Sequence, residues 1–89
     1  MASVTYEYDD ETVIVTGGSS GIGRAIALAF GTAGATVINA DITPEPKDAD
    51  ATEPTHEAIE ADDGNALYVE TDVSSRADIE SVVEAAREL

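Results

Sequence analysis

An apolar run followed at once by a glycine-rich turn is the feature of this sequence that most constrains its fold. Val13-Ile14-Val15 has the composition of a buried strand, and Thr16-Gly17-Gly18-Ser19-Ser20-Gly21-Ile22-Gly23 comes directly after it. Glycines let the chain turn tightly and let a ligand approach the backbone, because no Cβ atom stands in the way. A helix that opens near Gly21 adds unpaired amides and a partial positive charge. The run therefore predicts a strand, a turn and a helix that together bind an anionic group such as a phosphate.

Short apolar runs alternate with helical patterns along the rest of the chain, which indicates βαβ units and a parallel sheet. The pattern predicts strands over residues 12–16, 36–40 and 66–70. Helices are predicted over about 21–33, 55–62 and 75–89. Gly34 is placed to close the first helix, and Ser75 with Asp78 forms a capping-box pattern at the start of the third.

The stretch 43–54, TPEPKDADATEP, contains all three prolines of the chain. It is long for a connection between a strand and a helix, which usually takes two to about six residues. One interpretation is a solvated, mobile loop. The other is a lid beside a bound nucleotide, because loops at the carboxyl ends of parallel strands surround the ligand crevice.

The chain is strongly acidic, with 19 Asp and Glu residues against 4 Lys and Arg, and a formal net charge of -15. This charge would repel nucleic-acid phosphates and anionic membranes. The hydrophobic fraction of 43% is ordinary and its residues are periodic, so we expect a folded domain with an acidic surface. The surplus of acid suggests adaptation to a salt-rich cytoplasm, with a merely acidic protein as the alternative.

Other parts of the sequence indicate little chemistry. The chain has no cysteine, so disulfides and thiolate metal sites are excluded. Residues 1–11 form an acidic lead in which Tyr6 and Tyr8 could mark an edge strand or a disordered segment. His56 is the only histidine and is expected to be a solvated surface residue rather than a metal ligand. With no signal-like or membrane-spanning apolar run, we expect a cytoplasmic location.

The run TGGSSGIG resembles the TGxxxGxG cofactor loop of the short-chain dehydrogenase/reductases and matches its spacing fully. The likeness continues with Asp41 after the second strand and with Asp72-Val73 after the third. It implies an α/β fold, a truncated Rossmann-type sheet of three parallel strands in the order 3-2-1 with flanking helices, over residues 12–89. The loop residues that it assigns to the cofactor are Gly17, Ser19, Ser20, Gly21, Ile22 and Gly23.

The resemblance also implies which dinucleotide binds. Asp41 follows Gly17 by 24 residues, near the spacing at which a dinucleotide fold places an acid on the adenosine ribose. A carboxylate there accepts hydrogen bonds from the diol and repels a 2′-phosphate. Family members that prefer NADP often carry arginine at the positions occupied here by Ser20 and Ile42. We therefore expect NAD rather than NADP, with Asp41 as an ordinary exposed strand-end acid as the alternative.

By the same resemblance, Asp72 and Val73 are expected to contact the adenine, with the carboxylate near its exocyclic amine. Asp72 could also help to cap the following helix. Both roles are compatible with one another.

The family moves a hydride between NAD and a secondary alcohol or sugar hydroxyl, with a tyrosine and a lysine four residues later. The positions four beyond Tyr6, Tyr8 and Tyr68 are not lysines, so no catalytic residue is assigned. We expect the N-terminal NAD-binding half of such an enzyme, inactive alone. Alternatives are a stand-alone adenine-nucleotide-binding module, or one piece of a split dehydrogenase whose partner chain completes the sheet.

A sheet that ends after three strands in this order would leave the first strand at an open edge. We expect its helices to lie mostly on one face, and the face that later helices normally cover to be bare.

Overall fold

The computed structural model describes residues 11–49 and 51–89. Strands and helices alternate strictly along them, as the sequence predicts. In chain order the elements are β1 (Thr12–Thr16), α1 (Gly21–Thr32), β2 (Thr36–Asp41), α2 (Thr55–Ala61), β3 (Asn65–Glu70) and α3 (Arg76–Arg87). The acidic lead with its two tyrosines lies outside the described residues, apart from Glu11.

The three strands form one parallel sheet in the order β1-β2-β3, so the predicted order 3-2-1 is confirmed. Val37 of β2 pairs with Val13 of β1, and Ile38 of β2 pairs with Leu67 of β3. All strands point the same way, so their carboxyl ends meet at one edge of the sheet. That edge carries the glycine turn after β1 and Asp41 at the end of β2.

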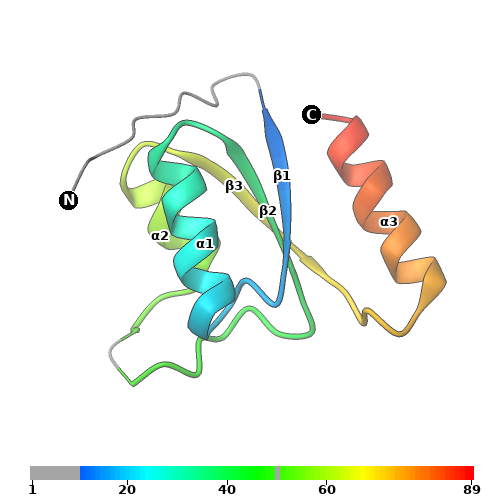
Figure 1. Ribbon diagram of the computed structural model, residues 1–89, viewed down its shortest axis with the longest axis horizontal. Coiled ribbons are helices and arrows are strands. Elements are labelled where there is room, and N and C mark those ends of the chain that lie inside the picture. Colours follow the sequence, from blue (N-terminus) through cyan, green and yellow to red (C-terminus); the bar gives the residue numbers. More distant parts are fainter. Residues whose placement is uncertain (1–10, 50) are drawn as a thin grey trace.

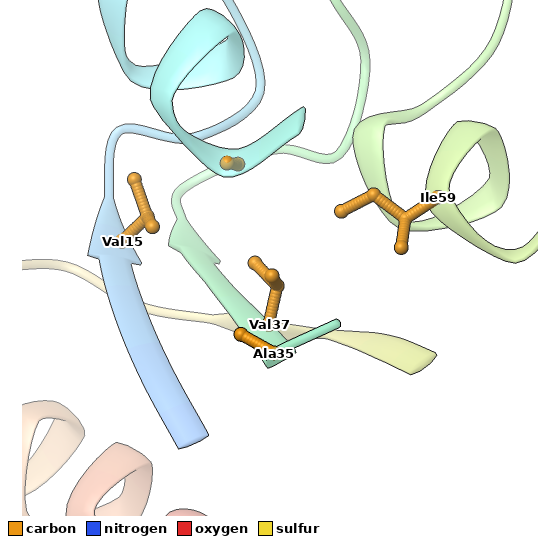
Figure 2. Packing of buried hydrophobic residues seen from close by; sticks show 5 residues of the cluster. Val15, Ala35, Val37 and Ile59 are labelled. Carbon is orange, nitrogen blue, oxygen red and sulfur yellow. The ribbon is translucent and has the colours of Figure 1, made fainter. Parts of the chain in front are cut away.

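One face of the sheet is covered by α1 and α2 (Figure 1). Figure 2 shows how Val15, Val37 and Ile59 meet between these helices and the sheet. Val15 and Val37 come from neighbouring strands, and Ile59 comes from α2. Burial of apolar side chains contributes about 25 cal/mol for each Å² removed from water, so this cluster stabilises the packing of α1 and α2 on the sheet.

The other face of the sheet carries α3 (Figure 1). Val82 of α3 packs against Ile38 and Ala40, which alternate along β2 with the residues that face α1. The expectation that this face would be bare is therefore wrong for the part that α3 covers. The reason is that the stripe of α3 needs an apolar partner, and the face beneath α1 and α2 is already filled.

Next to α3, the same face keeps an apolar hollow of about 370 Å³. It is lined by Ile14, Thr16, Ala40, Thr71, Val73, Ile79, Val82 and Val83. Among the described residues, β1 pairs only with β2, so its other side is an open edge as expected. The hollow and the open edge adjoin each other at Ile14.

The helix ends follow the sequence signals with one difference. Gly34 has a φ of 98° and its amide donates to the Gly31 carbonyl, which closes α1. Ser75 accepts a hydrogen bond from the Asp78 amide at the start of α3. The Asp78 carboxylate, however, accepts from the Asp72 amide rather than from Ser75, so the capping box is only half formed. No helix of the described residues is long and apolar enough to cross a membrane.

Candidate functional site

A hollow of about 180 Å³ lies at the carboxyl ends of the strands. It is lined by Gly17, Ala40, Asp41, Ile42, Thr71, Asp72 and Val73. Five of these residues were predicted from the sequence to bind the cofactor, from three separate places in the chain. The parallel sheet brings them together because each lies at the carboxyl end of a strand or just after it. The other predicted residues lie in the turn and at the start of α1.

The glycine turn needs glycine for two different reasons. Gly17 and Gly21 have φ values of 67° and 60°, a region that costs other residues energy. Gly23 is instead required by packing, because a Cβ atom there would lie 2.1 Å from the carbonyl oxygen of Gly17. Gly23 therefore lets the first turn of α1 pack directly against Gly17 and Gly18.

The two serines of the turn use their hydroxyls within the protein. Ser19 is buried, donates to the Thr43 carbonyl and accepts from the side-chain amide of Asn39 over 2.9 Å. Ser20 accepts a hydrogen bond of 2.6 Å from the Lys47 amide. Both hydroxyls thus join the turn to the loop that follows β2.

The start of α1 holds a carboxylate of the chain itself. The Gly21 amide donates to both oxygens of Asp48, over 2.9 and 3.1 Å. The side chain of the next residue, Ile22, is exposed to solvent. Negative groups are stabilised at helix N-termini by the free amides and the helix dipole. The loop over residues 43–54 therefore contacts the glycine turn and the start of α1 through the Lys47 amide and the Asp48 carboxylate.

Asp41 accepts hydrogen bonds from four other residues. One carboxylate oxygen accepts from the Ser19 amide over 3.1 Å, and the other from the Ile42 amide over 2.6 Å. Its carbonyl accepts from the Tyr68 hydroxyl over 2.9 Å and from the Thr71 amide over 2.8 Å. Burial raises the pKa of Tyr68 above 10.0, and the charges of Glu70 and Asp41 raise it further.

Asp72 is exposed, and its carboxylate makes only local bonds. The Ser74 hydroxyl donates to it over 2.6 Å and the Ser74 amide over 2.9 Å. These two bonds hold the pKa of the Asp72 carboxyl below its usual value of 3.8. They also form a turn that leads into α3. The N-cap of that helix is Ser75, and both bonds of the Asp72 carboxylate go to Ser74, which precedes the helix.

Two exposed apolar side chains flank the hollow. Ile42 is 63% exposed and Val73 is 59% exposed. Large apolar side chains in such positions lower the free energy of a complex when a flat apolar group covers them.

Sequence reasoning missed three buried polar residues beneath the turn: Arg24, Asn39 and Thr55. The Asn39 amide group donates to Ser19, while its oxygen has no partner among the described residues and is buried. A Cβ atom on Gly18 would lie 2.6 Å from that oxygen. The available signal was a polar residue inside the apolar run of β2, which is a position where polar groups are rare.

His56 differs from the expectation of a solvated surface residue. It stacks on Tyr68 with ring centroids 6.1 Å apart, and its Nε2 lies 4.0 Å from Glu57. Its Nδ1 is buried with no partner among residues 11–49 and 51–89. Across that same part of the chain, no three His, Cys, Asp or Glu residues cluster in a way that could hold a metal ion.

A family model described as short chain dehydrogenase matches residues 11–89. The chain belongs to the short chain dehydrogenase family. The resemblance stated from the glycine turn is thus confirmed. Membership in this family implies a nicotinamide dinucleotide as cofactor.

Curated proteins similar to the chain are named as oxidoreductases or dehydrogenases. An uncharacterized oxidoreductase of Listeria monocytogenes is 35% identical over 89% of the chain. A 2,5-dichloro-2,5-cyclohexadiene-1,4-diol dehydrogenase of Sphingobium indicum is 37% identical over 82%. The 7alpha-hydroxysteroid dehydrogenase of Escherichia coli is 33% identical over 88%. The chain spans only 26% to 30% of the length of these relatives.

Part of the crystal structure of a hydroxysteroid dehydrogenase from Escherichia coli is similar to this chain in fold. It superposes with a TM-score of 0.77 and 31% sequence identity, covering 90% of this chain and 32% of that one. The predicted α/β fold of the short chain dehydrogenases is confirmed by this likeness.

Proposed function

We propose that the chain is the N-terminal, NAD-binding segment of a short chain dehydrogenase, and that the hollow at the strand ends receives the adenosine. The observation that carries the proposal is that Gly17, Asp41 and Asp72 line one hollow at the carboxyl edge of a parallel sheet. Ligands of open α/β sheets bind at that edge.

Each predicted residue has a role in this proposal. Asp41 accepts hydrogen bonds from the ribose diol, and the Asp72 carboxylate accepts one from the exocyclic amine of the adenine. Ile42 and Val73 cover the two sides of the base, since both are exposed beside the hollow. The amides at the start of α1 bind the pyrophosphate in place of the Asp48 carboxylate. The two hydrogen bonds that the Gly21 amide donates to that carboxylate support this role, because they place an anionic group there.

The preference for NAD over NADP rests on charge. Asp41 is one of the two carboxylates that line the hollow, and in the proposed pose it lies at the ribose, where it would repel a 2′-phosphate. Ser20 and Ile42 supply no cation at the neighbouring positions. Arg24 is only 9% exposed and donates to Glu53 and Thr55 beneath the turn.

For the whole enzyme we propose hydride transfer between NAD and a secondary alcohol or sugar hydroxyl. When bound, NAD supplies the group that accepts the hydride. The residues of this chain bind and orient it, and none of them is assigned a catalytic role. The relatives named as diol and hydroxysteroid dehydrogenases support an alcohol as the substrate class.

We further propose that additional polypeptide completes the sheet at β1. The open edge of β1 and the apolar hollow beside α3 support this, because unpaired edges and apolar patches favour association. The net charge of -15 argues against nucleic acids and anionic membranes as partners. It also supports a salt-rich cytoplasm as the location.

Calorimetric titration of the 89-residue chain with NAD and with NADP tests the proposal. We expect NAD to bind at least about tenfold more tightly, a difference of about 1.4 kcal/mol. Asp41→Ala should weaken NAD and bring the two affinities close together. Failure of the wild-type chain to bind NAD contradicts the proposed function, and equal affinities for the two dinucleotides contradict the role of Asp41.

A further inference from the structure

A chain of hydrogen bonds passes beneath the glycine turn and joins α1, α2 and the loop between β2 and α2. Arg24 is nearly buried, and its Nη1 donates to the Glu53 carbonyl over 2.9 Å and to the Thr55 hydroxyl over 3.1 Å. Thr55 is fully buried, and its hydroxyl donates to the Gly18 carbonyl over 2.6 Å. The turn is therefore held from below by a residue 37 positions further along the chain.

The direction of these bonds is fixed by Arg24. A threonine hydroxyl has one proton to donate and lone pairs to accept with. A guanidinium only donates and stays charged, so the proton of Thr55 is left for the Gly18 carbonyl. Neither ion pair found among residues 11–49 and 51–89 involves Arg24, so its charge acts on these neutral oxygens. Hydrogen bonds from a charged donor are stronger than those between neutral groups.

The peptide unit between Gly18 and Ser19 passes the effect on to Asp41. Its carbonyl accepts from Thr55, and its amide donates to the Asp41 carboxylate over 3.1 Å. A peptide unit is planar and rigid, so its carbonyl and its amide cannot turn independently. Rotation of this unit would break the bond to Thr55 and the bond to Asp41 together.

We propose that Thr55, oriented by Arg24, is a positioning residue for the Asp41 carboxylate. It acts through the Gly18–Ser19 peptide unit and touches no part of the ligand itself. The inference rests on the proposed function, in which Asp41 binds the ribose. Without the Thr55 hydroxyl the peptide unit loses one of its two fixed ends, and the carboxylate loses a defined orientation toward the diol.

Titration of the 89-residue chain and its variants with NAD tests this role. Thr55→Val keeps the shape of the side chain and removes the hydroxyl, and we expect NAD to bind about tenfold more weakly, in line with one lost hydrogen bond. Thr55→Ser restores the hydroxyl and should bind within about twofold of the wild type. If Thr55→Val fails to fold, Arg24→Lys takes its place, with an expected loss of about threefold.

A matched control separates positioning from general destabilisation. Ile59→Val shortens a buried side chain on the same helix and lowers stability without touching the hydrogen bonds. It should leave the affinity for NAD unchanged when binding is measured well below the unfolding temperature. An equal loss of affinity in Ile59→Val and Thr55→Val would overturn the inference.

A double-mutant cycle with Asp41→Ala supplies the decisive readout. If Thr55 acts through Asp41, Thr55→Val should weaken NAD by less than about twofold once Asp41 is alanine. If the losses of NAD affinity caused by Thr55→Val and Asp41→Ala simply multiply in the double variant, the inference is overturned. An unchanged affinity in Thr55→Val alone would also overturn it. In both cases tight NAD binding by the wild type leaves the proposed function standing. If the wild type does not bind NAD, the proposed function and this inference both fail.

Discussion

Asp41 and Asp72 line the same hollow, but the protein holds them in different ways. Asp41 ends β2, and its contacts come from the glycine turn, from Tyr68 and from the residue after β3. Asp72 is exposed and depends on Ser74 and Asp78, which are its near neighbours in sequence. The comparison teaches that the ribose side of the proposed site is built by tertiary structure and the adenine side by a local turn. Substitutions at distant residues should therefore disturb the Asp41 side of the site but not the Asp72 side.

The largest effect is expected from Gly23→Ala, which acts on the Asp41 side. A Cβ atom there would lie 2.1 Å from the Gly17 oxygen and 2.8 Å from its carbonyl carbon. Backbone atoms cannot move aside as a flexible side chain would, so α1 must shift away from the turn. We expect a loss of about 3 kcal/mol in the free energy of unfolding and no measurable NAD binding.

Gly21→Ala is the control for that substitution. A Cβ atom on Gly21 meets nothing within 4 Å, and only its φ of 60° is unfavourable. Urea unfolding should give a smaller loss of about 1 kcal/mol. Equal losses for the two variants would show that the contact between α1 and the turn is not the constraint.

Removing each carboxylate in turn tests the comparison directly. Asp41→Ala should weaken NAD about 10- to 100-fold, because a charged acceptor with two ribose donors is lost. Asp72→Ala should weaken it by only about threefold, since an exposed acceptor competes with water. Isothermal titration measures both. A larger loss of NAD affinity for Asp72→Ala than for Asp41→Ala would contradict the assignment of Asp41 to the ribose and Asp72 to the adenine.

Salt should act on both sides of the site through the net charge of -15. The Debye length falls from about 10 Å at 0.1 M salt to about 3 Å at 1 M, which screens the repulsion between the chain and an anionic dinucleotide. We expect the affinity for NAD to rise about threefold between these KCl concentrations. Adenosine, which is uncharged, serves as the control ligand. An affinity for NAD that falls with salt would contradict this electrostatic account.

The smallest effect is expected at Ser74. Ser74→Ala removes the hydroxyl bond, so the pKa of Asp72 should rise toward 3.8. Because folding lowers the pKa of Asp72, the Ser74 bonds stabilise the folded chain at pH values above the usual pKa of 3.8. This stabilisation is lost as the pH falls through the lowered pKa of the folded chain. Carboxyl carbon NMR measures the shift. Ser81→Ala removes a hydroxyl bond to Ala77 within α3 and should leave the pKa unchanged.

Local patterns were sufficient to predict the helices and strands, but not how they are arranged in space. The alternation of apolar runs and helical stripes predicted each element to within a residue or two, and Gly34 closes α1 as its position indicated. The strand order followed from the family resemblance of the glycine turn. The position of α3 did not follow, because the periodicity of a helix shows that it has an apolar stripe but not which face of the sheet receives it.

The site was predictable only for residues that carry a motif or end a strand. Arg24, Asn39 and Thr55 lie in different elements, and only the folded chain brings their polar atoms beneath the turn. The capping pattern at Ser75 was recognised, but the bond from Asp72 to Asp78 needs a loop geometry that the spacing does not specify. Buried polar networks are a tertiary property, and sequence spacing alone does not reveal their partners.

The central claim is that the strand-end hollow with Asp41 at its side binds NAD, and NMR titration of the amide signals tests it most directly. We expect saturable shifts at Gly17, Gly21, Asp41 and Val73 as NAD is added. Gly64, which precedes β3 at the amino ends of the strands, should change little. Saturable shifts centred on Gly64, or no saturable shifts at all, would contradict the account.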